Sequence, residues 1–221
     1  MFTIDNIRIS ALQVGLDACS VASATYYDQD AQYMNRWVAQ GQHGNMEYLE
    51  HNCDKRYDIR LLVPGAVSVV VCLLRYENCG HDYHRTMKSK LYELEHMLME
   101  QSQHTLQVAN TQHIFCDSAP VLERRIAQDA GLGFIGRNHQ FIHPVLGSRV
   151  HIGELVLNED VIGRDQPVVN SCGQCTQCIE ACPNHALGNE EWDATKCVAY
   201  ITHKCEICQI NCPYNESRFS K

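Results

Sequence analysis

The pattern of apolar and polar residues predicts strands alternating with helices along the first three quarters of the chain. The β-branched apolar run SVVVCLL at 68–74 is typical of a buried strand, and SRVHIGELVLN at 148–158 predicts another. Between them, residues 88–101 place leucine and methionine side chains three or four positions apart, which predicts a helix with a core-facing stripe. Residues 31–50 also look helical, with a break at glycine. We therefore expect a mixed α/β (α+β) fold.

A strand followed directly by a helix is predicted near the middle of the chain. HIFC at 113–116 has strand character and runs into DSAPVLERRIAQDAG, where Pro120 suits the first helical turn and Gly131 suits the C-terminal cap. Asp117 is then expected at the corner where the strand gives way to the helix. Its carboxyl could cap free N–H groups at the helix start, or it could act as a catalytic acid.

The glycines after this helix have the G-x-G-x-x-G spacing of dinucleotide-binding loops. Gly131, Gly133 and Gly136 follow a helix rather than a strand, so the spacing lacks the structural context that such a loop requires. We interpret them as a tight turn or as positions where the backbone approaches another group closely.

The chain of 221 residues is long enough for one substantial core and a smaller appendage. A polar, proline-containing stretch, DVIGRDQPVV, places the boundary near residue 165, so we expect a larger module at 1–165 and a smaller one at 166–221. No apolar run approaches the roughly 20 residues of a membrane helix, and the N-terminus lacks the pattern of a signal peptide. A cytoplasmic protein without a membrane partner is therefore expected.

Net charge and cysteine content narrow the function classes further. The formal net charge is −8, so the chain lacks the general basic surface of DNA-binding proteins, and no DNA partner is expected. Of the 13 cysteines, eight fall between positions 172 and 212. Clustered cysteines in a reducing compartment are typical of metal ligands rather than of disulfides.

The clustered cysteines follow the spacing of bacterial ferredoxins. Residues 172–183 have the form C-x2-C-x2-C-x3-C-P, in which the fourth cysteine binds the neighbouring cluster. A second run at 205–213 closes in the same way, but Thr202 occupies its first position and cannot supply a thiolate, which leaves Cys197 as the nearby replacement. If the runs exchange their last cysteines, one 4Fe-4S cluster takes Cys172, Cys175, Cys178 and Cys212, and the other takes Cys182, Cys197, Cys205 and Cys208.

Two tetrahedral zinc sites are the structural alternative, because they also use C-x2-C spacing and would only hold the small module together. Three cysteines at successive x2 spacing, with both runs closed by Cys-Pro, favour cubane clusters. Two adjacent clusters can take single electrons from a soluble donor and pass them on. About 165 residues precede them, far more than an electron carrier needs, so we expect the electrons to serve a reaction within this chain.

Longer stretches resemble a known family. MEYLEHNCDKR, DYH, CDSAPVLERRIAQDAGLGFIGRN and the cysteine runs together resemble epoxyqueuosine reductases, the cobalamin-dependent iron–sulfur enzymes of queuosine biosynthesis. The resemblance implies a nitroreductase-like α/β module that holds cobalamin, with the ferredoxin-like module beside it, an arrangement similar to that of reductive dehalogenases. The implied reaction is the two-electron removal of an epoxide oxygen from a modified base at the tRNA wobble position, with an external ferredoxin or flavodoxin as electron donor.

The resemblance also assigns roles to individual residues. Asp117 in DSAP corresponds to the family's general acid, and a partly desolvated carboxyl could have the raised pKa that such an acid needs. Without the resemblance, Phe141 and Ile152 look like core residues and Arg56 looks like a surface arginine. The implied cobalamin-binding positions, with the cysteine near the cobalt, are Arg56, Cys79, Asn138, Phe141 and Ile152.

Three departures from the family concern the substrate. The loop before DYH is short, only VAYITHK separates Cys197 from Cys205, and the chain stops at Lys221 without the family's C-terminal extension. Together with the acidic net charge, they weaken the expectation of a tRNA substrate more than that of the cofactor. Two alternatives therefore stand beside an epoxyqueuosine reductase. One is a shortened relative that reduces a small molecule or a corrinoid, and the other is an electron-transfer protein without cobalamin.

Overall fold

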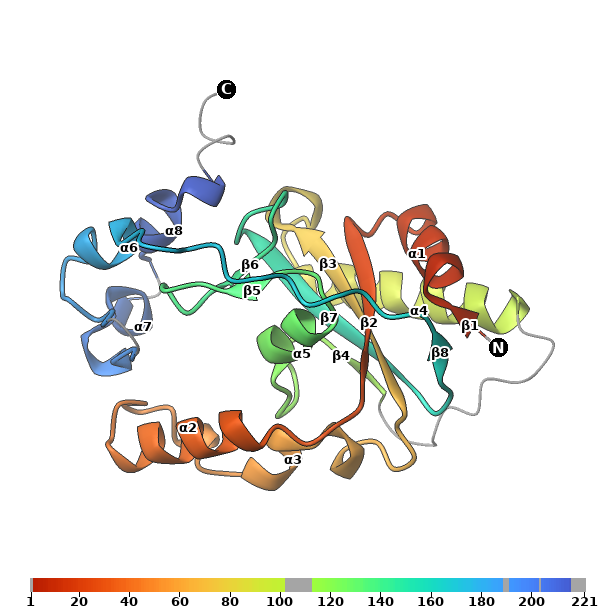
Figure 1. Ribbon diagram of the computed structural model, residues 1–221, viewed down its shortest axis with the longest axis horizontal. Coiled ribbons are helices and arrows are strands. Elements are labelled where there is room, and N and C mark those ends of the chain that lie inside the picture. The colour runs from red at the N-terminus through yellow and green to blue at the C-terminus, as the bar shows by residue number, and fades with distance from the viewer. Residues whose placement is uncertain (1, 102–112, 189–190, 203, 216–221) are drawn as a thin grey trace.

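The computed structural model describes residues 2–101, 113–188, 191–202 and 204–215, and within them a four-stranded sheet forms the centre of the protein (Figure 1). The strands lie in the order β2–β3–β7–β4, and each neighbouring pair is antiparallel. Their bounds are Ala18–Ser23 for β2, Ser68–Arg75 for β3, Ile114–Phe115 for β4 and Val150–Leu157 for β7. The strands predicted from 68, 113 and 148 are confirmed, whereas β2 was not predicted.

Strand β3 is buried on both faces of the sheet, which explains its uninterrupted apolar sequence. Successive side chains of a strand point to opposite faces, so β3 contributes to two separate hydrophobic cores. The side chains in the first core are Val70, Cys72 and Leu74, and those in the second core are Val69, Val71 and Leu73.

The first core lies between the sheet and the helices α1 (Ile4–Gln13) and α4 (Tyr83–Gln101). The helix predicted at 88–101 is confirmed, and it begins five residues earlier. Its buried stripe has the three- and four-residue spacing of one helix face. The fully buried members of that stripe are Met87, Leu91, Leu94 and Leu98.

The second core lies on the opposite face of the sheet, under α5 (Glu123–Asp129). The segment after β2 extends away from it as α2 (Asp28–Ala39) and α3 (Cys53–Tyr57), which form the lower layer in Figure 1. The helical stretch predicted at 31–50 does break at glycine. It ends at Ala39, and a short 3-10 helix follows at Glu47–Leu49. A second 3-10 helix, Ile59–Leu61, leads into β3.

The prediction that Pro120 lies in the first turn of a helix is wrong. Residues 116–120 form bends, residues 121 and 122 are irregular, and α5 begins only at Glu123, with Leu122 at its N-cap. Asp117 has a φ of 48°, a left-handed conformation that a helix cannot contain, so the chain must leave it before a helix can start. The C-terminal prediction holds, because Gly131 has a φ of 77° directly after the helix.

The glycines after α5 form a tight turn into a hairpin of β5 (Phe134–Ile135) and β6 (Phe141–Ile142). A Cβ on Gly133 would lie 2.2 Å from the carbonyl oxygen of Ile142, so only glycine allows the hairpin to approach this closely. Close backbone approach and a tight turn are therefore both present at this place.

A parallel pair, β1 (Phe2–Thr3) with β8 (Val161–Ile162), closes the end of the first core. The chain then passes Asp165, whose carboxyl accepts hydrogen bonds from Arg8 and Ser20, so residue 165 is still attached to the first module. A module boundary near this residue stays a prediction.

The C-terminal module is built from short helices and lies beside the sheet in Figure 1. Its attachment includes a buried polar cluster. Asn215 donates to the Ser148 hydroxyl and accepts from the Ser148 backbone, and Gln209 donates to the same serine. None of the helices in the described part of the chain is long and apolar enough to span a bilayer. The helices of this module are α6 (Gln177–Glu180), the 3-10 helix Ala194–Lys196, α7 (Val198–Thr202) and α8 (Ile207–Ile210).

Candidate functional site

Asp117 lies on the bend between β4 and α5, as the sequence predicted, and its side chain is exposed. Its carboxyl does not cap the helix, because the N-cap of α5 is Leu122 and no side chain there accepts a capping hydrogen bond. Instead, Asp117 Oδ2 accepts a hydrogen bond of 2.9 Å from the hydroxyl of Tyr83. The capping interpretation is therefore excluded, and the carboxyl is available for chemistry.

Tyr83 is held in place by a stack of aromatic rings. Its ring lies 3.9 Å from that of His151 at 6° between planes, and the rings of His84 and Tyr76 continue the stack on either side. Burial and the hydrogen bond to Asp117 raise the pKa of Tyr83 above its usual value, so it remains a phenol that can donate to the carboxylate. Burial and the nearby His84 lower the pKa of His151 to about 4, which leaves its ring neutral within the stack.

Glu123 holds the main chain of the same corner. Its Oε1 atom accepts a hydrogen bond from the backbone N–H of Asp117. Burial raises the pKa of Glu123 to about 7; the N–H of Asp117 lowers it, and the negative charge of Asp117 raises it again. The corner is thus fixed on two sides, through its carboxyl by Tyr83 and through its backbone by Glu123.

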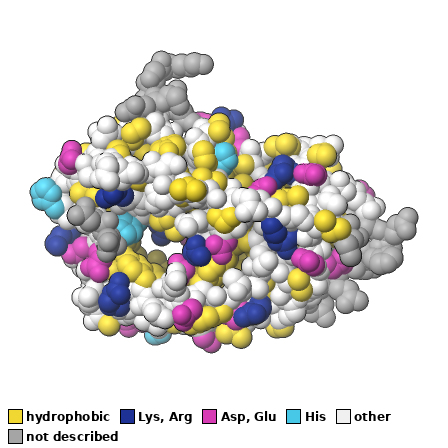
Figure 2. Space-filling view, in the orientation of Figure 1, with side chains coloured by type: hydrophobic (Ala, Val, Ile, Leu, Met, Phe, Trp, Pro, Cys, Tyr) yellow, Lys and Arg dark blue, Asp and Glu magenta, His cyan; other side chains and the backbone are white. Residues whose placement is uncertain are grey.

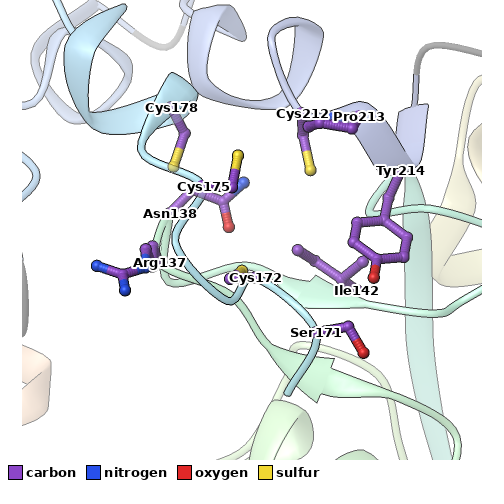
Figure 3. Close-up of a pocket in the computed structure, with 10 residues that line it drawn as sticks. All are labelled: Arg137, Asn138, Ile142, Ser171, Cys172, Cys175, Cys178, Cys212, Pro213 and Tyr214. Atoms are coloured by element: carbon purple, nitrogen blue, oxygen red, sulfur yellow. The ribbon is translucent and has the colours of Figure 1, made fainter. Parts of the chain in front are cut away.

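The first predicted set of cysteines surrounds a single cavity of about 280 Å³ (Figure 3). The sulfur atoms of Cys172, Cys175, Cys178 and Cys212 turn toward this shared space, although Cys212 is more than 30 residues away in sequence. Burial and the thiols of the other three raise the pKa of Cys178. Tyr214 and Ile142 form the opposite wall.

The second predicted set is also brought together. Burial raises the pKa of Cys208 to about 11, and the neighbouring thiols of Cys197, Cys205, Cys178 and Cys182 contribute to the increase. Cys197 therefore lies near the second run, as the missing position at Thr202 requires. The side chain of Thr202 donates to the carbonyl of Val198 within α7.

The size of the cavity indicates which kind of centre fits it. Four thiolates bound to one zinc ion at 2.3 Å lie only about 3.8 Å apart and leave no room for a cavity. Within the described ranges, no three His, Cys, Asp or Glu side chains are close enough together to hold one metal ion. A cubane, which separates its ligands by a body of iron and sulfide, fits the observed space better.

A surface hollow lies between α2, the start of α5 and α7 (Figure 2), and we call it the central hollow. Arg124, the second residue of α5, lies within electrostatic range of Tyr33 on α2, of Tyr48, and of Asp117 and Glu123. One of its guanidinium nitrogens donates to the carbonyl of His139. Guanidinium and phenol groups around an open hollow fit a large ligand with amide oxygens at its edge, as a corrin has.

The residues predicted to contact cobalamin are spread over several environments. Arg56 is buried, and its guanidinium donates to the backbone carbonyls of residues 48, 49 and 51. Much of its hydrogen-bonding capacity is therefore used by the loop that precedes it. Cys79 is buried in the first core, and its thiol donates to the carbonyl of Tyr76. The cobalamin roles of both residues stay predictions.

The other predicted contacts lie deeper than an open binding surface. Asn138 is buried, lines the cysteine cavity and donates weakly to the carbonyl of Cys208 at 3.4 Å. Phe141 and Ile152 are both buried in the second core. These two residues thus lie where an ordinary core residue would lie, and their contact with a corrin also stays a prediction.

Sequence reasoning did not single out Tyr83, Glu123, Arg124 or Glu154. The first three lie in the motifs DYH and DSAPVLERRIAQDAG, whose residues were not assigned separate roles apart from Asp117. Glu154 had a usable signal, because it is a charged residue inside the otherwise apolar strand VHIGELVL. A carboxylate in a strand that is buried on both faces requires an explanation.

Comparison with known proteins agrees with this geometry. Residues 171–204 match the family model of a 4Fe-4S double cluster binding domain, which confirms the expected pair of clusters, while the assignment of individual cysteines stays a prediction. An epoxyqueuosine reductase from Leadbetterella byssophila is 35% identical over 95% of this chain and 78% of its own length. This chain belongs to the epoxyqueuosine reductase family.

Solved structures of the family share its fold. The structure of epoxyqueuosine reductase from Streptococcus thermophilus superposes with a TM-score of 0.85 at 25% identity, over 96% of this chain and 65% of that chain. An epoxyqueuosine reductase solved with an epoxyqueuosine-modified tRNA-Tyr stem loop gives a TM-score of 0.83 at 25% identity, over 97% of this chain and 65% of that one. This chain therefore spans about two thirds of the length of the solved family members.

A more distant likeness confirms the architecture that the sequence suggested. A reductive dehalogenase whose structure was used to suggest a mechanism for B12-dependent dehalogenation has a TM-score of 0.53 at 16% identity, over 95% of this chain and 31% of that one. At this identity the likeness shows the fold alone. The expected mixed α/β fold and the resemblance to the family are both confirmed.

Proposed function

We propose that this protein reduces the epoxide of epoxyqueuosine in tRNA to give queuosine, with cobalamin bound in the central hollow. The observation that carries the proposal is the position of Asp117. Its carboxyl is exposed and oriented by Tyr83, and it lies within electrostatic range of Arg124 at the start of α5. A family member solved with an epoxyqueuosine-modified tRNA stem loop supports the choice of substrate.

The reaction requires two electrons and two protons for each epoxide. Both C–O bonds of the ring break, a carbon–carbon double bond forms, and the oxygen leaves as water. Cobalamin, when bound, supplies the reductant that acts on the substrate. The electrons enter singly from an external ferredoxin or flavodoxin and pass through the two clusters, which the chain holds within one small module.

The side chains of this protein do three things in the proposed reaction. Arg124 would hold the corrin by donating to its amide oxygens, and Tyr33 and Tyr48 lie within electrostatic range of that guanidinium. Tyr83 fixes the rotamer of Asp117 by its hydrogen bond to Oδ2, which leaves Oδ1 to carry the proton. Asp117 donates that proton to the departing oxygen as a general acid.

One feature favours a different substrate as the second candidate. Only seven residues separate Cys197 from Cys205, and most of them form the short helix α7 beside the central hollow. A shorter segment there leaves the hollow less covered than in the family, as expected for a shortened relative that reduces a small molecule or a corrinoid. This candidate shares the cofactor and Asp117 but not the binding of tRNA.

The test is an anaerobic assay with tRNA that carries epoxyqueuosine. The protein is loaded with both clusters and cobalamin, supplied with a reduced one-electron donor, and the tRNA is digested to nucleosides for mass spectrometry. We expect epoxyqueuosine to disappear and queuosine to appear in equal amount. Omission of cobalamin should abolish the conversion.

The alternatives give different results in the same experiment. A shortened relative would bind cobalamin but would neither shift tRNA in a gel nor change its nucleosides. An electron carrier would show no spectral change when cobalamin is added. Failure of the fully loaded protein to form queuosine would rule out the proposed substrate.

A further inference from the structure

Asp117 is part of a group of three carboxyls. Glu123, at the start of α5, accepts a hydrogen bond from the Asp117 backbone, and Glu154 lies on β7, the strand against which α5 packs. Glu154 shares a strand face with Ile152 and Val156, both of which belong to the second core under α5. All three carboxyls lie within electrostatic range of one another.

The three carboxyls differ in their access to water. Asp117 is exposed, Glu123 is half-buried, and Glu154 is completely buried. Within the described part of the chain, neither carboxyl oxygen of Glu154 has a hydrogen-bond partner. A charge without a partner in that position is very unfavourable. Glu154 therefore stays protonated and is not expected to exchange its proton.

Glu123 is placed to exchange protons as well as to hold the corner. Its Oε1 atom accepts from the Asp117 N–H, and a carboxylic acid can still accept there through its carbonyl oxygen while Oε2 carries the proton. Burial raises the pKa of Glu123 to about 7, so near neutral pH it holds a proton more readily than an exposed glutamate does. Glu123 therefore contacts the backbone of Asp117 and lies within electrostatic range of its carboxyl.

We propose that Glu123 supplies the second proton of the reaction, by returning a proton to Asp117 after Asp117 has given up its own. The inference rests on the proposed function, because only the removal of an epoxide oxygen as water requires two protons at this corner. Glu123 acts through Asp117 and is a positioning residue that also reloads the acid.

The proton balance is simple. Asp117 gives the first proton to the opening epoxide and becomes a carboxylate. Glu123 transfers its proton to Asp117, and Asp117 passes it to the same oxygen, which leaves as water. Glu123 then takes a proton from solvent, and Asp117 is reloaded in the same way before the next turnover. The two electrons come from the external ferredoxin or flavodoxin.

The groups that face Glu123 determine how its proton responds to pH. Asp117 adds negative charge when ionised, and Arg124 on the same helix adds positive charge. Tyr83 from α4 and Cys116 from the end of β4 remain neutral near pH 7, because burial raises the pKa of both groups. Glu154 is neutral as well, so near pH 7 the charge at the corner changes mainly through Glu123.

The decisive variant is Glu123→Gln, with Glu93→Gln on the exposed surface of α4 as the matched control. Glutamine keeps an oxygen that accepts from the Asp117 N–H, so the corner stays in place, but it cannot carry the proton. We expect kcat to fall by about 10- to 100-fold in Glu123→Gln, because the bound substrate covers Asp117 and slows its reloading from solvent. The control should retain the wild-type kcat.

The pH profile separates reloading from a structural role. In the wild type, kcat should decline as pH rises through about 7, because Glu123 loses its proton over that range. In Glu123→Gln this decline should be absent, and the solvent isotope effect should increase. A variant that only disturbed the fold would lower kcat at every pH and keep the decline.

Infrared spectroscopy gives a readout that does not depend on activity. The carboxylic acid band of the wild type should contain a component that titrates near pH 7, absent from Glu123→Gln and present in Glu93→Gln. If no such component exists, or if Glu123→Gln keeps the wild-type kcat and pH profile, the reloading role is wrong. An inactive wild type that shows the component would instead overturn the proposed function, and the reloading role with it.

Discussion

Replacement of Asp117 by asparagine is expected to lower kcat for queuosine formation by about 10²- to 10⁴-fold. Asparagine has nearly the same shape, and its side-chain oxygen can still accept the hydrogen bond from Tyr83. It cannot give a proton to the departing oxygen. The loss should therefore appear in kcat, measured in the steady state with the tRNA concentration above its KM, while the affinity for tRNA changes little.

The matched control is Asp160→Asn, because Asp160 is an exposed aspartate before β8 at the far end of the sheet. Both variants should contain the same amounts of iron and cobalamin as the wild type. If Asp117→Asn forms queuosine at the wild-type rate, Asp117 is not the acid, and another group must protonate the oxygen.

The second large effect concerns the clusters. Replacement of Cys197 by alanine is expected to reduce the iron content from about eight to about four atoms per chain, because the second cluster loses a ligand that no other nearby thiol can replace. Iron analysis of anaerobically purified protein measures this loss directly. The remaining cluster should be the one enclosed by the 280 Å³ cavity.

Electron paramagnetic resonance of the reduced variants tests the exchange of ligands between the two runs. Cys182→Ala and Cys197→Ala should leave the same residual signal, and Cys212→Ala should leave the other one. Cys53→Ala, which removes a thiol outside both sets, should leave both signals intact. If Cys212→Ala instead left the same signal as Cys197→Ala, and Cys182→Ala left the other one, the exchange of ligands would be wrong.

The central strands and the cluster region were predictable because their signals are strong and local. An apolar run such as 68–74 has few alternatives to a buried strand, and cysteine spacing reports the shape of the ligand directly. The strand β2 was missed because its sequence, ACSVAS, is short and contains small polar residues. The strand that it pairs with in the sheet, β3, lies far along the chain.

The arrangement around Asp117 could not be predicted, because it depends on contacts between distant segments. Tyr83 reaches the carboxyl from another helix, and the left-handed conformation of Asp117 delays the start of α5 to Glu123. A proline five residues after the end of β4 suggested an earlier helix, since local preference takes no account of the tertiary hydrogen bonds that hold the bend. Arg56 likewise looked like a surface residue, yet its side chain is buried and its donors hold a surface loop together.

The central claim is that this chain holds a corrin next to Asp117 and within reach of its clusters. Anaerobic titration of the cluster-loaded protein with cob(II)alamin, followed by electron paramagnetic resonance, tests it most directly. We predict a base-off signal that saturates at one cobalamin per chain and disappears when a reduced one-electron donor is added. A spectrum that remains identical to that of free cob(II)alamin at all protein concentrations would contradict the claim and favour an electron carrier.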